Sequence, residues 1–254
     1  MTENEMLAAI NRHHWLVRDK GYEVVMTVLI GSQNYKLDSE ASDIDTFTFI
    51  LPSLEELATA HEPISGEFEV DDGKCMYKDI RLALNLLKKT SPNSVECFTG
   101  QYRIFSTRYK KILEKYLEDD ELVNKMVHCN YSHMLYAIAG MAHQLTKRNM
   151  SAGKRYSHAL RLRSMIEIFT STLDYKSLLK LLPRDYEEAR TAKFDTRDLE
   201  YYNSGCELIA QYLENVRDSF EMSDYNKNIE KEGLILIKEF QKELMLRYLR
   251  EELE

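Results

Sequence analysis

The stretch that decides the fold reads GSQNYKLDSEASDIDTFTFILP and covers residues 31–52. It places a Gly-Ser turn ahead of two closely spaced aspartates, Asp43 and Asp45. The runs on either side, residues 23–30 and 43–51, are rich in β-branched and aromatic residues, which predicts two strands. Because side chains alternate along a strand, the two aspartates are expected to emerge together on one side of it.

This arrangement suits a metal-bound nucleotide. Gly31 would let the backbone approach a ligand closely, while the Ser32 hydroxyl and the amides of the turn would donate to phosphate oxygens. Two neighbouring carboxylates repel each other, and a divalent cation offsets that repulsion. The alternative for an isolated Asp-x-Asp is a polar strand entry with solvated acids.

The rest of the chain divides into a mixed part and a helical part. A helix is expected over residues 4–20 and a hairpin over 67–78, with Asp79 as the cap of the following helix. After about residue 105 the apolar residues recur with helical spacing, and the expected helices cover residues 131–147, 152–182, 196–220 and 227–253. This order predicts an α+β fold, with residues 1–104 as an α/β domain and residues 105–254 as an all-helical domain.

Composition excludes several classes of protein. The net charge of −8 over 254 residues gives no general attraction for a phosphate backbone. No apolar run approaches the roughly 20 residues of a membrane span, and the acidic start has no signal-like segment, so a cytoplasmic protein without membrane association is expected. The four cysteines form no Cys-x-x-Cys pair, which argues against a zinc module or a disulfide scaffold.

Gly31-Ser32 after a strand, followed by Ser42-Asp43-Ile44-Asp45, resembles the signature of the DNA polymerase beta-like nucleotidyltransferase superfamily. Together with KDIR at 78–81 and SPNSVECFT at 91–99, it resembles the nucleotidyltransferases that are common in bacteriophages and occur beside RNA ligases in bacteria. The resemblance covers residues 24–102 well and extends more loosely to residues 154–165.

The resemblance implies transfer of a nucleoside monophosphate from an NTP to a hydroxyl acceptor with two divalent metals, Mg²⁺ or Mn²⁺. It assigns Gly31 and Ser32 to triphosphate binding, and Asp43 and Asp45 to catalysis and metal coordination. An RNA end, a protein hydroxyl and a small molecule are all open as acceptors.

The chain departs from the family pattern at two positions. Lys36 stands where the phage members usually have glycine, and Met76 stands where the third carboxylate is expected. A thioether does not replace an oxygen ligand of magnesium. A two-residue turn at Asp72-Gly73 would put Glu69 opposite Met76, so Glu69 is predicted as a substitute catalytic acid, with an ordinary solvated strand residue as the alternative.

A second group of candidate residues lies in SAGKRYSHALRLRS, residues 151–164. On a helix Lys154, His158 and Arg161 share one face, where they would bind a triphosphate. The family carries a similar pattern, which extends the nucleotide-binding assignment to these residues. A solvated basic stripe is the alternative.

Two functions follow. The first is metal-dependent nucleotidyl transfer. The second is a catalytically impaired NTP-binding or protein-interaction module, for example a phage-encoded factor that acts on a host protein, and Met76 favours it.

Overall fold

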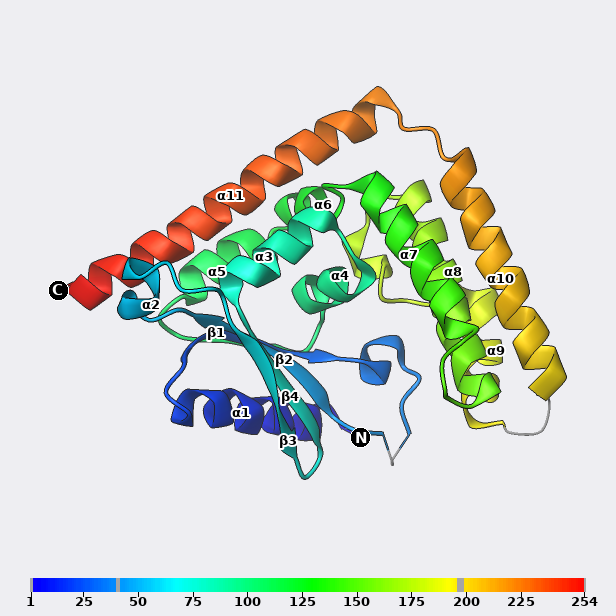
Figure 1. Cartoon of the computed structure of the whole chain (residues 1–254), viewed down its shortest axis with the longest axis horizontal. Helices are drawn as coiled ribbons and strands as arrows, with labels where there is room; N and C mark the ends of the chain where they lie inside the picture. Colours follow the sequence, from blue (N-terminus) through cyan, green and yellow to red (C-terminus); the bar gives the residue numbers. More distant parts are fainter. Residues whose placement is uncertain (1, 40–41, 196–198, 254) are drawn as a thin grey trace.

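The computed structural model describes residues 2–39, 42–195 and 199–253, and it has the predicted α+β fold (Figure 1). The strands are β1 (Glu23–Ile30), β2 (Asp45–Leu51), β3 (Ser65–Val70), β4 (Gly73–Asp79) and β5 (Arg103–Phe105). The helices that accompany them are α1 (Glu3–Asp19), η1 (Ser32–Tyr35, a 3-10 helix), α2 (Leu54–Ala58), α3 (Ile80–Lys89) and α4 (Pro92–Thr99). The helical part contains α5 (Lys110–Leu117), α6 (Asp120–Val127), α7 (Tyr131–Leu145), α8 (Ala152–Ser171), η2 (Tyr175–Ser177), α9 (Pro183–Phe194), α10 (Leu199–Ser219) and α11 (Asp224–Leu253).

The five strands form one mixed sheet in the order β3-β4-β2-β1-β5. Among the described residues, β2 and β4 pair in parallel, and the other three strand pairs are antiparallel. β1 lies inside the sheet and its middle residues are buried on both faces, which explains its continuous apolar run. One face packs on α1 through residues such as Ile10 and Leu29, and the other joins the main core through Val25 and Val28.

The first elements lie close to their predicted bounds, because strong local signals fix them. β1 has the predicted ends, and the Asp79 carboxylate accepts a hydrogen bond from the Arg81 amide at 2.8 Å, as expected of a helix cap. β2 begins at Asp45, two residues later than predicted, so Asp43 precedes the strand.

The helical part differs from prediction in one important respect. The helix predicted over residues 152–182 ends at Ser171, and a separate helix, α9, follows η2. The first three residues of the helix predicted over 196–220 lie outside the described residues, and α10 covers the remainder up to Ser219. α11 lies along α3, α5 and α6 (Figure 1). In the described ranges, no helix combines the length and the apolar character needed to cross a membrane.

The division at residues 104 and 105 stays a prediction. β5 spans this position, and one hydrophobic cluster contains residues of both predicted domains, from Val25 in β1 to Tyr248 in α11. The sheet and the helices therefore share a core.

The predicted register of the β3–β4 hairpin is wrong. Val70 pairs with Gly73, so the turn consists of Asp71 and Asp72. Tertiary contacts hold this turn, because the Asp72 carboxylate binds Arg12 and His13 and its carbonyl accepts a hydrogen bond from the Ile44 amide at 2.7 Å.

Candidate functional site

The predicted site residues, except Glu69, line one cavity of about 400 Å³, called here the first cavity. One side comes from residues 31–39 and 42–45, between the end of β1 and the start of β2, which extend from the sheet toward α8 and α9 (Figure 1). The other side comes from α8 and α9. The polar and charged residues of its lining, together with the glycine of the turn, include Gly31, Ser32, Ser42, Asp43, Asp45, Lys154, Ser157, His158, Arg161 and Lys193.

Gly31 makes the sharp turn that ends β1. Its φ of 96° and ψ of −152° belong to a region that side chains exclude, so only glycine adopts it without strain. Its amide donates to the Glu96 carboxylate at 2.6 Å, and Ser32 then opens η1 at the edge of the cavity.

The two aspartates occupy the same cavity wall in different settings. The backbone carbonyl of Asp43 accepts a hydrogen bond from the side-chain Nε2 of Gln33 at 2.6 Å, and the Asp45 carboxylate accepts one from the backbone amide of Lys74 at 3.1 Å. Burial raises the pKa of Asp45, the Lys74 amide opposes this, and the neighbouring Asp43 raises it further. The repulsion between these two carboxylates is what a cation would relieve.

Three cations and a histidine form the opposite wall. Ser151 caps α8 by accepting a hydrogen bond from the Lys154 amide at 3.4 Å. Burial, followed by the charges of Arg161, Lys154, Lys193 and Arg148, lowers the pKa of His158 to about 3. His158 is therefore a neutral imidazole at neutral pH, and its Nδ1 faces the Arg161 guanidinium at 3.3 Å. Such a concentration of positive charge suits a polyanion.

Lys193 is a site residue that the sequence did not reveal. It lies near the end of α9, and its ammonium group donates to the Leu37 carbonyl at 2.5 Å. Burial, then Lys154 and Arg161, lower the pKa of Lys193. α9 can approach α8 closely because Gly153 of α8 has no side chain at the contact. A Cβ at this position would lie only 1.9 Å from the Ala192 carbonyl oxygen. No local signal in α9 predicts this contact.

Besides His158, two neighbours contact Arg161, namely Tyr35 and Glu96. Its guanidinium lies over the Tyr35 ring, 3.5 Å from the centroid, and faces Glu96 at 3.9 Å. Glu96 is only 8% exposed and also accepts a hydrogen bond from Asn34 at 3.1 Å. The Nε of Arg161 is buried and has no hydrogen-bond partner in the described part of the chain.

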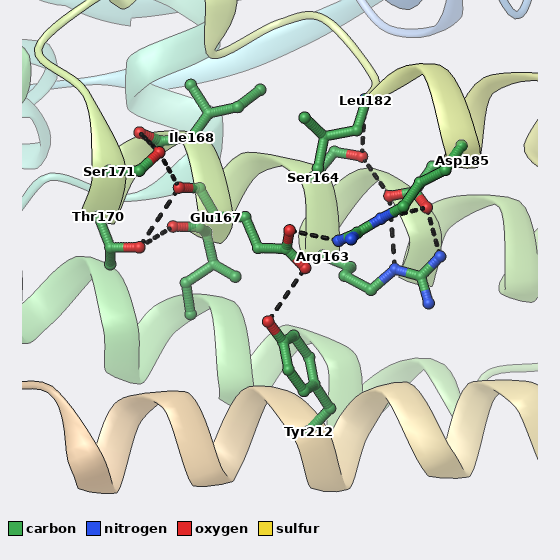
Figure 2. A network of polar contacts seen from close by, with 11 residues as sticks. Arg163, Ser164, Glu167, Ile168, Thr170, Ser171, Leu182, Asp185 and Tyr212 are labelled. Carbon is green, nitrogen blue, oxygen red and sulfur yellow. Dashed lines mark hydrogen bonds and ion pairs between the residues drawn. The ribbon is translucent and has the colours of Figure 1, made fainter.

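A buried polar network ties α8 to α9 (Figure 2). Asp185 of α9 is fully buried, forms an ion pair with Arg163, and accepts a hydrogen bond from the Ser164 hydroxyl at 2.6 Å. Ser164 in turn accepts a hydrogen bond from the Leu182 amide at 3.1 Å. The two helices that carry the cations are thus fixed to each other away from the cavity.

Met76 and Glu69 do not complete the first cavity. Met76 pairs with Phe47 on β2 and with Glu67 on β3, and it lines a second, mainly apolar cavity of about 330 Å³. Glu69 pairs instead with Lys74, with which it forms an exposed ion pair at 2.7 Å. The register by which Glu69 was predicted to replace the missing carboxylate is therefore wrong.

The donor set fits a divalent cation that shares its ligands with a substrate. In residues 2–39, 42–195 and 199–253, no group of three or more His, Cys, Asp or Glu side chains is placed to hold a metal. Magnesium commonly uses one or two carboxylates and completes its shell with water and substrate phosphates. Asp43 and Asp45 would supply the two carboxylates, and Ser32 and Ser42 place hydroxyl oxygens in the same cavity.

The comparison with family models identifies the fold family. The RlaP model, described as the RNA repair pathway DNA polymerase beta family, matches residues 2–172. The chain belongs to the RlaP family. It is thus a member of a polymerase beta-like nucleotidyltransferase family, as the resemblance implied. None of the curated proteins compared with the chain matches it.

The RlaP match includes every predicted residue of the first cavity, from Gly31 to Arg161. It ends before α9, so Lys193 lies outside the matched range. The cation from α9 is a feature of this chain that the family match does not describe.

Proposed function

We propose that the protein transfers a nucleoside monophosphate from an NTP to a hydroxyl acceptor in a reaction that depends on Mg²⁺ or Mn²⁺. The observation that carries this proposal is the shared cavity, in which two acids face three cations beside a Gly-Ser turn. Membership of the RlaP family supports the same class of reaction.

The residues of the first cavity have complementary roles in this proposal. The Ser32 hydroxyl and the turn donate to the phosphates, while Lys154, Arg161 and Lys193 balance their charge. A cation held by Asp43 and Asp45 would supply neutralisation of the charge that develops on the phosphates. These contacts orient the α-phosphate for in-line attack.

The transfer needs no covalent enzyme intermediate. The acceptor oxygen forms a bond to the α-phosphorus, and the bond from that phosphorus to the oxygen bridging the α- and β-phosphates breaks. Pyrophosphate leaves with the electron pair of that bond, and the hydroxyl proton passes to solvent.

The test uses each labelled NTP with Mn²⁺ and candidate acceptors, including short RNAs. We expect label transfer by the wild type, and loss of transfer in Asp43→Ala and Asp45→Ala. Asp71→Ala is the matched control, because Asp71 is an exposed turn residue outside the first cavity. Absence of transfer with every NTP and acceptor, together with unaltered NTP binding in both cavity variants, would contradict the proposal.

Met76 supports a second function, an NTP-binding or protein-interaction module with impaired catalysis that acts on a host protein. Its side chain offers no hard ligand where the family pattern has a carboxylate. Pull-down from a host lysate, with and without NTP, tests this function. A stoichiometric partner that binds Asp43→Ala and Asp45→Ala as it binds the wild type would favour the module over the enzyme.

A further inference from the structure

The second cavity adjoins the first. The two share Gly31, His158 and Arg161 as lining residues. Most of the remaining lining of the second cavity is apolar and includes Phe47 and Met76 from the sheet. Its volume of about 330 Å³ lies near the lower end of the range for small-molecule sites, about 300–1,000 Å³.

The position of this cavity relates it to the reacting atoms. Phe47 follows Asp45 by two residues on β2, so both side chains project from the same face of the sheet. Met76 lies beside Phe47 in the register of β4 with β2. A molecule whose hydroxyl reaches an α-phosphate held in the first cavity therefore has the second cavity next to it.

The lining favours a flat, polarisable ring. Met76, Met141 and Met165 contribute thioethers, which adapt to irregular shapes and make favourable contacts with aromatic rings. The Phe47 ring adds an aromatic surface of the kind on which unstacked bases pack.

The polar residues of the second cavity suit the edge of a base and its phosphate. Asn93 and Gln144 are exposed, and their amides offer both donors and acceptors. Arg148 is exposed as well and provides a cation for a backbone phosphate. An aliphatic ligand would leave these three groups without a role.

From these features we propose that the second cavity binds the terminal nucleobase of an RNA acceptor, whose hydroxyl then faces the first cavity. This inference rests on the proposed nucleotidyl transfer and specifies its acceptor as RNA. Met76 then acts as part of the acceptor pocket at a position where the family pattern has a metal ligand.

The test follows the isotope-labelled methyl groups of the eleven methionines by NMR. The probes are Mg²⁺ with a non-hydrolysable NTP, and then a short oligoribonucleotide with a free 3′ hydroxyl added to that complex. We expect the oligoribonucleotide to shift the methyl signals of Met76, Met141 and Met165, and the NTP to leave them nearly unchanged.

A cavity-filling variant separates the two ligands. Met141→Trp should weaken oligoribonucleotide binding by about tenfold, the effect expected from the loss of one stacked base. NTP binding, measured by calorimetry, should be unchanged. Met245→Trp is the matched control, because Met245 is also partly buried against the core but lies on α11, away from both cavities.

Three outcomes would overturn the inference. Shifts of the three methyl signals by NTP alone, with weaker NTP binding in Met141→Trp, would show that the cavity takes the base of the donor. Unshifted signals with RNA, while NTP binds normally, would exclude an RNA base there and leave a protein or small-molecule acceptor. Absence of NTP binding by the wild type would overturn the proposed function itself, and the acceptor role with it.

Discussion

The carboxylate of Glu96 accepts a hydrogen bond from the backbone amide of Gly31 at 2.6 Å. The same buried side chain faces Arg161 at 3.9 Å, so it links the turn after β1 to the cation wall on α8. Glu96 lies in the family-like segment SPNSVECFT, but its sequence context gives no indication of this link.

Replacing this carboxylate should loosen both sides of the first cavity. Glu96→Gln keeps an acceptor for Gly31 but removes the charge opposite Arg161. We expect the free energy of unfolding to fall by about 1–3 kcal/mol, because the largely buried Arg161 guanidinium loses the carboxylate that faces it. NTP affinity should fall as well. Chemical denaturation and calorimetry measure the two effects, with the exposed Glu239→Gln as control. Equal behaviour of both variants would contradict the role of Glu96.

Lys193 should contribute directly to binding of the triphosphate. Lys193→Gln is expected to weaken NTP binding by about tenfold or more, because hydrogen bonds to charged groups contribute about 1.5–3 kcal/mol. Lys193→Arg should retain most of the affinity because it preserves the charge. Arg190→Gln, on an exposed position of the same helix outside the first cavity, is the control in a calorimetric titration. An affinity of Lys193→Gln equal to that of the control would exclude Lys193 from the site.

Lys36 should carry backbone strain. Its φ of 56° and ψ of 33° are left-handed, a conformation that favours glycine, which is the residue the resemblance leads one to expect at this position. A left-handed conformation costs an L-residue about 1–2 kcal/mol, and a glycine at this position would avoid that cost. Glycine also loses more conformational entropy on folding, which takes back about 0.5–1 kcal/mol of the gain. Lys36→Gly is therefore expected to raise the free energy of unfolding by up to about 1 kcal/mol.

Thermal denaturation tests the strain at Lys36. Lys36→Val should lower the melting temperature, since a β-branched side chain tolerates this conformation least. NTP affinity should not change in either variant, because Lys36 lines a different cavity with Tyr186 and Lys180. A lower melting temperature for Lys36→Gly would contradict the strain.

The neutral state of His158 predicts how stability depends on pH. Its pKa falls from 6.5 to about 3 on folding, so between these values the unfolded chain binds a proton that the folded chain does not. Stability therefore decreases as the pH falls below 6.5. One pH unit below this value costs about 1.4 kcal/mol for one such group.

Acid denaturation of His158→Gln tests this linkage. The loss of stability between pH 7 and about 5.5 should be smaller in this variant than in the wild type by about 1 kcal/mol. His143→Gln, at an exposed position on α7, is the control. An identical pH dependence in all three proteins would show that folding does not lower the pKa of His158.

Sequence patterns predicted the parts of the site that local spacing defines. Gly31, Asp43 and Asp45 follow from one short motif, and Lys154, His158 and Arg161 follow from helical periodicity; all six reach the same cavity. Their chemical roles stay predictions. Lys193 depends on where α9 packs, which no local pattern reveals.

The β3–β4 register could not be predicted because the Asp71-Asp72-Gly73 segment allows two turns. Contacts of Asp72 with Arg12 and His13, about sixty residues earlier in the chain, decide between them. Those contacts join segments that are far apart in sequence. The turn lies one residue earlier than predicted, which shifts the pairing by two residues, so that Glu69 lies opposite Lys74 and not opposite Met76.

The buried pairing of Asp185 with Arg163 and Ser164 has a consequence for ligand capture. Since α8 and α9 are already locked together, the cation wall is organised in the free protein, and a nucleotide loses little affinity to the ordering of these helices. Capture of the polyphosphate should then be fast, accelerated by attraction to this wall, and should slow markedly as added salt screens it.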